Sequence, residues 1–154
     1  IHKLMYFMQE AGEPLRLKYV KGTYGPYAKN LHHVLDRIEG HFIVGYGEGT
    51  EAPGKTIECK EGAVLQAEQF LQDRGATLER LSRVSRLIEG FETPYGMELL
   101  ASVHWVACRE NEAAREDVEA AVKETHNWSP RKQKMFRDEH VRAAWDQLRT
   151  EDWL

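Results

Sequence analysis

One stretch of the chain carries residue types at a spacing that could bind phosphate. Residues 47–58 read GEGTEAPGKTIE, in which Gly49, Gly54, Lys55 and Thr56 satisfy the pattern of a phosphate-binding loop. Such a loop surrounds phosphates with backbone N–H groups and a helix N-terminus, so it needs a strand directly before it and a helix directly after it. The pattern predicts nucleotide binding only if a helix opens at Thr56.

The residues on either side of this loop favour a hairpin instead. The runs HFIVGYG at 41–47 and KTIEC at 55–59 are both strand-like, so strand continues where a helix is required. Pro53 removes one N–H from the loop, and Glu48 and Glu51 put negative charge where phosphates would lie. We therefore expect a β-hairpin with an acidic tip and no nucleotide site.

The remaining titratable residues form no recognisable catalytic or metal-binding signature. His32 and Asp36 share a predicted helix face at metal-ligand spacing, but two ligands do not complete a site. His104 falls in an apolar helical stripe, where a hydrogen-bonded core histidine is expected. Cys108 has no base at a predictable distance; we expect it and Cys59 to be core or near-core thiols in a reducing, cytoplasmic setting. The sequence thus predicts no catalytic residue, metal or cofactor.

The distribution of charge favours a protein partner over a nucleic acid or a membrane. The 154 residues carry a formal net charge of −4, and the segment 61–124 is the acidic part, with seven basic and thirteen acidic residues. Such a segment repels nucleic acid and attracts a basic protein groove, although solvated helix faces would look the same. The one basic cluster, SPRKQKMFR at 129–137, is followed by two acids and is expected to be a solvated helix start. No apolar run is long enough to span a bilayer.

The periodicity of apolar residues predicts a mainly α fold with a small β-hairpin (α+β). A first helix ends at Gly12, a short strand follows within 13–22, and a second helix over 26–39 opens at Pro26. Helix, turn, helix and hairpin is the order of a winged helix-turn-helix. We therefore expect one compact domain in which a winged-helix-like subregion, 1–60, packs on a helical subregion, 61–154.

Helices in the second subregion are predicted from apolar spacing and from capping residues. The expected helices are 64–71, stopped near Gly75; 77–91; one capped by Thr93 with Pro94 in its first turn; one ending by His126; one opening at Ser129-Pro130; and a last one through Val141, Trp145 and Leu148. The four tryptophans are expected in the core.

Two tyrosine-containing turns could be rigid recognition elements. TYGPY at 23–27 and TPYG at 93–96 place tyrosines beside Pro and Gly at predicted helix starts, where an aromatic ring can be held half exposed. Core-anchored helix starts would carry the same residues, so both interpretations stay open.

Two long blocks resemble a known family. KLMYFMQEAGEPLRLKYVKGTYGPYAKNLHHVLDRIEGHFIVGYG at 3–47 and RLIEGFETPYGMELLASVHWVA at 86–107 are similar to the region that follows the macrodomain in DarG-type antitoxins, and the likeness covers nearly the whole chain. In that family the macrodomain removes ADP-ribose from DNA, and the C-terminal domain binds the DarT toxin, which ADP-ribosylates thymidine in single-stranded DNA. The resemblance implies an inhibitory binding domain, partnered by the toxin and by an upstream macrodomain, without hydrolase activity of its own.

A toxin that holds single-stranded DNA needs a basic groove with stacking surfaces, which acidic and tyrosine side chains could fill in place of phosphates and bases. The candidate contacts lie at the hairpin tip and the helix starts: Tyr24, Tyr27, Glu48, Glu51, Glu92, Tyr95 and Glu98. The alternative is a winged-helix DNA-binding repressor that reads DNA with helix 26–39. That helix carries only Lys29 and Arg37 against Asp36 and Glu39, which is poor equipment for reading bases.

Overall fold

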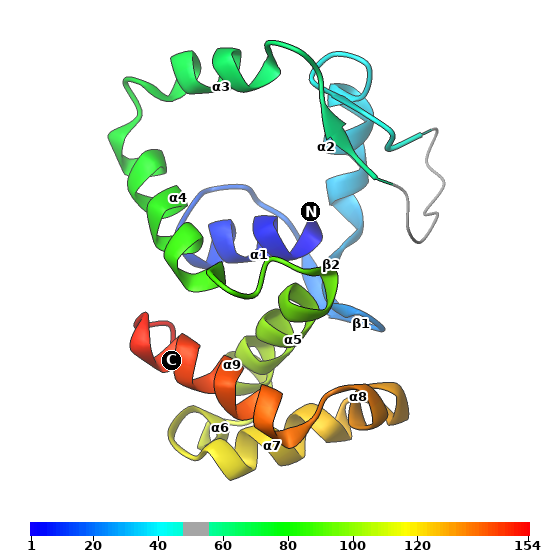
Figure 1. Ribbon diagram of the computed structural model, residues 1–154, viewed down its shortest axis with the longest axis vertical. Coiled ribbons are helices and arrows are strands. Elements are labelled where there is room, and N and C mark those ends of the chain that lie inside the picture. Colours follow the sequence, from blue (N-terminus) through cyan, green and yellow to red (C-terminus); the bar gives the residue numbers. More distant parts are fainter. Residues whose placement is uncertain (48–55) are drawn as a thin grey trace.

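The computed structural model describes residues 1–47 and 56–154 and is mainly α-helical, with two small antiparallel sheets (Figure 1). In chain order the elements are α1 (His2–Glu10), β1 (Tyr19–Gly22), β2 (Gly25–Ala28), a 3-10 turn (Lys29–Leu31), α2 (His32–Ile38), β3 (Ile43–Val44), β4 (Glu58–Cys59), α3 (Ala63–Leu71), α4 (Gly75–Ile88), α5 (Pro94–Trp105), a π-helical turn (Val106–Glu110), α6 (Ala113–Glu116), α7 (Val118–Asn127), α8 (Pro130–Met135) and α9 (Asp138–Thr150). Among these helices none is long and apolar enough to cross a membrane.

The main core forms around α5, which runs through the middle of the molecule between α1 and the helices α7 and α9 (Figure 1). Tyr6 and Phe7 of α1 are fully buried there against apolar residues of α4, α5 and α9. Burial of each such side chain stabilises the fold by about 1.5–3 kcal/mol. The first helix is therefore part of the same core as the C-terminal helices.

The predicted helix over 26–39 is wrong in its first half. Gly25–Ala28 is a strand that pairs with Tyr19–Gly22 through a two-residue turn, and α2 begins only at His32. Gly25 adopts a φ of +96°, which suits a glycine in this tight turn. Pro26 and Tyr27 are strand residues because their segment pairs with Lys21 and Val20 of β1. This pairing provides the backbone hydrogen bonds that a helix would otherwise provide.

The second hairpin is confirmed, whereas the winged-helix arrangement is not. Ile43 pairs with Cys59 and Val44 with Glu58 in antiparallel register. However, a β-hairpin separates α1 from α2 where a helix-turn-helix would have a simple turn, and α2 spans 7 residues. The division of the chain near residue 60 stays a prediction.

The capping predictions in the C-terminal half are confirmed. Thr93 Oγ1 accepts a hydrogen bond from the Gly96 N–H at 3.0 Å, and Ser129 Oγ accepts one from the Lys132 N–H at 3.2 Å. The helix predicted at 64–71 is found as Ala63–Leu71, but Gly75 opens the next helix instead of ending this one.

Candidate functional site

The structure supports the hairpin interpretation of the phosphate-loop pattern. Gly49, Gly54 and Lys55 lie outside the described residues. Directly downstream, Glu58–Cys59 is a strand paired with β3, and the next helix begins only at Ala63. The prediction that strand rather than helix follows the loop is therefore confirmed.

His104 is buried beside the half-buried Cys108, but their environment disfavours a nucleophilic thiolate. His104 is 3% exposed, its Nδ1 lies 2.7 Å from the Tyr6 hydroxyl, and its Nε2 lies 3.5 Å from Cys108 Sγ. Burial lowers the pKa of His104 to about 3 and raises the pKa of the Cys108 thiol. A thiol with a raised pKa is a poor nucleophile. The prediction of a hydrogen-bonded core histidine is confirmed; the prediction for Cys59 is wrong, because that residue is exposed.

His32 is engaged by tyrosine hydroxyls rather than placed for a metal. Its Nε2 lies 2.6 Å from the hydroxyl of Tyr27, and its Nδ1 contacts the hydroxyl of Tyr46. Tyr27 also stacks on the ring of His2 at 4.7 Å between centroids. Across 1–47 and 56–154 no group of three or more potential metal ligands is found.

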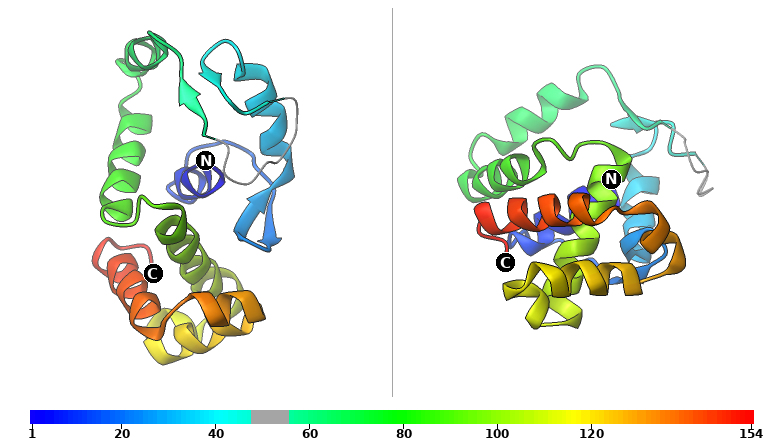
Figure 2. Two further views of the ribbon diagram at one scale, coloured as in Figure 1. Left: turned by 45° about the vertical axis from the view of Figure 1, so that its right-hand side comes forward. Right: turned by 60° about the horizontal axis from the view of Figure 1, so that its bottom comes forward.

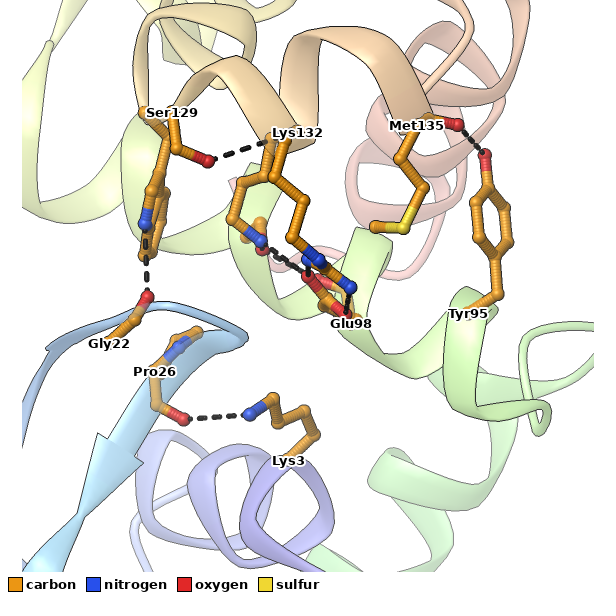
Figure 3. Close-up of polar contacts among 11 residues, drawn as sticks. Lys3, Gly22, Pro26, Tyr95, Glu98, Ser129, Lys132 and Met135 are labelled. Atoms are coloured by element: carbon orange, nitrogen blue, oxygen red, sulfur yellow. Dashed lines mark hydrogen bonds and ion pairs between the residues drawn. The ribbon is translucent and has the colours of Figure 1, made fainter. Parts of the chain in front are cut away.

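A buried cluster of charges joins α5 to α8 (Figure 3). Arg131 donates two hydrogen bonds to the carboxylate of Glu98, at 2.6 and 3.1 Å. Lys132 donates to the same carboxylate at 2.8 Å and to Ser102 Oγ at 2.9 Å, while Ser102 donates to the Glu98 carbonyl oxygen. Lys132 is 0% exposed and Glu98 is 8% exposed. The basic cluster at 129–137 is therefore not simply a solvated helix start.

Hydrogen bonding outweighs burial in setting the charge of Glu98. Burial raises its pKa, but hydrogen bonds from Arg131 and Lys132 hold the pKa below the ordinary value. Burial lowers the pKa of Lys132, an effect that its bond to Glu98 opposes. Lys3 lies nearby and donates to the Pro26 carbonyl oxygen at 3.2 Å, and burial lowers its pKa to about 8. The cluster thus joins α5 to α8, and Lys3 beside it joins α1 to β2.

The prediction that Glu98 is a surface carboxylate is wrong. It was expected to substitute for a DNA phosphate, which requires an accessible negative charge. Its carboxylate is instead buried and compensated by two cations. The charge of Glu98 is thus compensated within the protein, and the carboxylate is not exposed as a phosphate mimic would need to be.

Tyr24 lies beside this cluster on the surface. It occupies the β1–β2 turn, is 57% exposed, and has the Arg131 guanidinium 4.7 Å above its ring. The turn is anchored by Trp128, whose Nε1–H donates to the Gly22 carbonyl oxygen at 3.1 Å. Tyr24 is therefore exposed and held in place, as the recognition interpretation requires. Tyr27 is half-buried in β2 and does not lie at a helix start.

Tyr95 and Glu92 lie at the start of α5. The Tyr95 hydroxyl is 2.7 Å from His140 Nδ1 and donates to the Met135 carbonyl oxygen at 3.4 Å, so the half-buried ring is fixed against α8 and α9. Glu92 is exposed in the loop before Thr93. Glu48 and Glu51 lie outside the described residues. Arg131 thus contacts both Tyr24 and Glu98. For Tyr95, a recognition role and a purely structural role both stay open.

The contacts of Arg131 and Lys132 with Glu98 were not predicted from the sequence. The available signal was the Ser129-Pro130 cap, which places Lys132 in the first turn of α8 next to Met135 and Phe136. Lys132 Nζ lies 4.9 Å from the ring centroid of Trp128 and 4.8 Å from that of Phe136. The burial itself depends on α5, which is remote in sequence.

Comparisons with known proteins find relatives named DNA ADP-ribosyl glycohydrolase over almost the whole chain. No protein-family model matches the chain. The chain is 42% identical over 157 residues to a DNA ADP-ribosyl glycohydrolase of Thermus aquaticus, in an alignment that covers 98% of the chain and 42% of that protein. It is 39% identical over 154 residues to a DNA ADP-ribosyl glycohydrolase of Mycobacterium tuberculosis, covering 96% of the chain and 43% of the relative. The chain thus spans less than half the length of the curated relatives that it matches.

Proposed function

We propose that the chain is the toxin-binding region of a DarG-type antitoxin and that it inhibits a DarT-type DNA ADP-ribosyltransferase. One observation carries this proposal: almost the whole chain is similar to less than half of proteins named DNA ADP-ribosyl glycohydrolase. The part of those relatives outside the match would hold the macrodomain and its hydrolase activity. The chain itself would therefore act by binding and not by catalysis.

The described residues support a binding role in two ways. Burial raises the pKa of the half-buried Cys108 thiol next to His104, which disfavours a thiolate nucleophile there. Tyr24 is exposed in the β1–β2 turn that Trp128 anchors, and Glu92 is exposed in the loop before α5. Such side chains could substitute for bases and phosphates in the toxin's single-stranded DNA groove.

A reconstitution tests the proposal. The chain is mixed with the toxin, co-elution is measured by size-exclusion chromatography, and ADP-ribosylation of a thymidine-containing single-stranded oligonucleotide is followed with NAD⁺. We expect a stable complex and loss of modification at a stoichiometric ratio. Full toxin activity in the presence of excess chain would refute the inhibitory role.

Two controls separate this function from its alternatives. The chain alone should leave ADP-ribosylated DNA intact, because hydrolysis is assigned to the macrodomain. A gel-shift with duplex DNA at low salt should show no tight complex; tight DNA binding without toxin would favour the repressor alternative.

Groove occupancy has its own test. Glu92→Lys should slow association with the toxin and reduce the salt dependence of the association rate, because electrostatic attraction acts mainly on encounter. If the association rate is independent of salt for both the unmodified chain and Glu92→Lys, the mimicry mechanism is refuted, but inhibition by another mode of binding is not.

A further inference from the structure

The turn between β1 and β2 is fixed at both ends by the helices beside it. Figure 1 and the right-hand view of Figure 2 show the β1–β2 hairpin and α8 on the same side of α5. At one end of the turn, the Gly22 carbonyl oxygen accepts a hydrogen bond from Trp128 Nε1 at 3.1 Å. At the other end, Gly25 is buried so closely that a Cβ in its place would lie 3.1 Å from Ser102 Oγ. The backbone that carries the exposed Tyr24 is therefore held against α5 and the α8 region.

The ring of Tyr24 is contacted by a guanidinium whose own position is fixed. Arg131 donates two hydrogen bonds to the two carboxylate oxygens of Glu98, at 2.6 and 3.1 Å. A two-bond arrangement of this kind fixes the plane of a guanidinium as well as its place. The same guanidinium lies 4.7 Å from the centroid of the Tyr24 ring. The buried carboxylate of Glu98 thus reaches the surface tyrosine through Arg131.

Arg131 is not needed to compensate the charge of Glu98. Lys132 is 0% exposed and already donates to the same carboxylate at 2.8 Å. The side chain of Arg131 is 39% exposed, and ion pairs that include an exposed partner contribute little to stability. A lysine would also supply the charge, but its ammonium forms neither the two-bond arrangement nor a flat surface for a ring. The contribution specific to Arg131 is therefore its contact with Tyr24.

We propose that Arg131 is a positioning residue, which Glu98 orients and which holds the Tyr24 ring in the orientation that the toxin binds. The inference rests on the proposed function, in which Tyr24 contacts the toxin. It gives Glu98 an indirect role in recognition in place of the direct contact that its burial prevents. Because the ring is ordered before the partner arrives, association avoids the entropy cost of immobilising it.

The test compares two matched arginine-to-lysine substitutions. Arg131→Lys keeps the charge beside Glu98 and removes the guanidinium from the Tyr24 ring. Arg142→Lys is the control, because Arg142 donates two hydrogen bonds to Glu119, both at 2.9 Å, and its side chain is also 39% exposed. Arg131→Gln, which keeps a hydrogen-bond donor without a guanidinium, is a second variant at the same position. Thermal melting verifies that each variant folds.

Toxin binding is measured by surface plasmon resonance, with Arg131→Lys made alone and together with Tyr24→Ala. We expect Tyr24→Ala to weaken binding by about 10- to 100-fold, as for a tyrosine at the centre of a contact. Arg131→Lys alone should weaken it by about 3- to 10-fold, because fewer chains present the ring in the binding orientation. In the Tyr24→Ala background the same change should have an effect of less than about twofold. Arg142→Lys should leave affinity unchanged.

A second measurement needs no toxin. Relaxation of the ¹³C nuclei in the Tyr24 ring reports its motion on the picosecond to nanosecond timescale. Arg131→Lys and Arg131→Gln should lower the order parameter of this ring, whereas Arg142→Lys should not. An equally ordered ring in all these variants would overturn the positioning role.

The binding data distinguish failure of this inference from failure of the proposed function. If the unmodified chain does not bind the toxin, the proposed function is refuted, and a positioning role in that binding is refuted with it. If the chain binds and Arg131→Lys binds as tightly, the positioning role alone is refuted. If Arg131→Lys weakens binding equally with and without the Tyr24 ring, Arg131 acts on the toxin directly, and the positioning role is again refuted.

Discussion

Helices α5 and α3 are both largely apolar, but α5 is buried and α3 is exposed. In α5 eight residues are buried, including the charged Glu98 and the polar His104, which form hydrogen bonds with Arg131 and Tyr6 of remote segments. In α3 the buried residue is Ala63, although most of the helix is apolar. The contrast teaches that composition alone does not distinguish a core helix from an exposed helix. The difference lies in which neighbours the chain brings to each one.

The largest test of this comparison is removal of the buried carboxylate in α5. Glu98→Gln would leave Lys132 and Arg131 without their counter-charge, and unpaired buried charge typically costs about 3–5 kcal/mol of stability. Urea unfolding monitored by circular dichroism measures the change. Glu92→Gln, which removes an exposed acid from the preceding loop, should change stability by less than about 0.5 kcal/mol. Equal effects of the two substitutions would show that the cluster is not a stabilising element.

Acid should also destabilise the α5 region through His104. Its folded-state pKa of about 3 lies below the ordinary value of 6.5, so the unfolded chain binds more protons between these values. The contribution of His104 to stability is therefore complete above about pH 6.5 and falls as the pH drops towards 3, by at most about 5 kcal/mol.

The measurement is the free energy of unfolding across this pH range. His104→Gln should flatten the acid-dependent loss, whereas His33→Gln, a change at an exposed histidine, should leave the pH profile as it is. If the free energy of unfolding falls equally steeply with acid in His104→Gln and in the unmodified chain, the loss belongs to other titrating groups.

A smaller effect is expected where α5 is tied to α8 and α9. Tyr95→Phe removes the hydroxyl that contacts His140 and Met135, which should cost about 0.5–1.5 kcal/mol. Tyr24→Phe, at an exposed ring, should cost less. Differential scanning calorimetry of both variants provides the comparison, and the opposite ranking would mean that the Tyr95 hydroxyl is not a structural contact.

The smallest effect on stability is expected in α3. Phe70→Ser removes a side chain that is 64% exposed, so the free energy of unfolding should change by no more than about 0.5 kcal/mol. Equilibrium denaturation checks this value. A loss above about 2 kcal/mol would show that Phe70 is packed in solution, and the contrast between α3 and α5 would then fail.

Predictions that depended on near neighbours in the chain were the most successful. The caps at Thr93 and Ser129 act on N–H groups within three residues, so the local sequence contains all that the interaction needs. The hairpin of β3 and β4 was recognisable from two strand-like runs around a turn. His104 was placed in the core by the apolar stripe in which it lies.

Predictions that depended on remote partners were less successful. Pro26 and Tyr27 have the spacing of a helix start, but pairing with β1 makes them strand residues. Glu98 was assigned to the surface and Lys132 to solvent, because neither segment alone shows that α8 packs on α5. Candidate contacts at Tyr24 and Glu92 stay predictions, since both are exposed and no partner is present.

The sequence by itself determined most of the helical segments, the start of several of them, and the resemblance to DarG-type antitoxins. Only the tertiary structure decided that Gly25–Ala28 is a strand, that Glu98 and Lys132 pair in the interior beside Arg131, and that α3 is left exposed. The physical reason is the range of the interactions. Capping and helix periodicity act over a few residues, whereas burial depends on segments that meet only after the whole chain has folded.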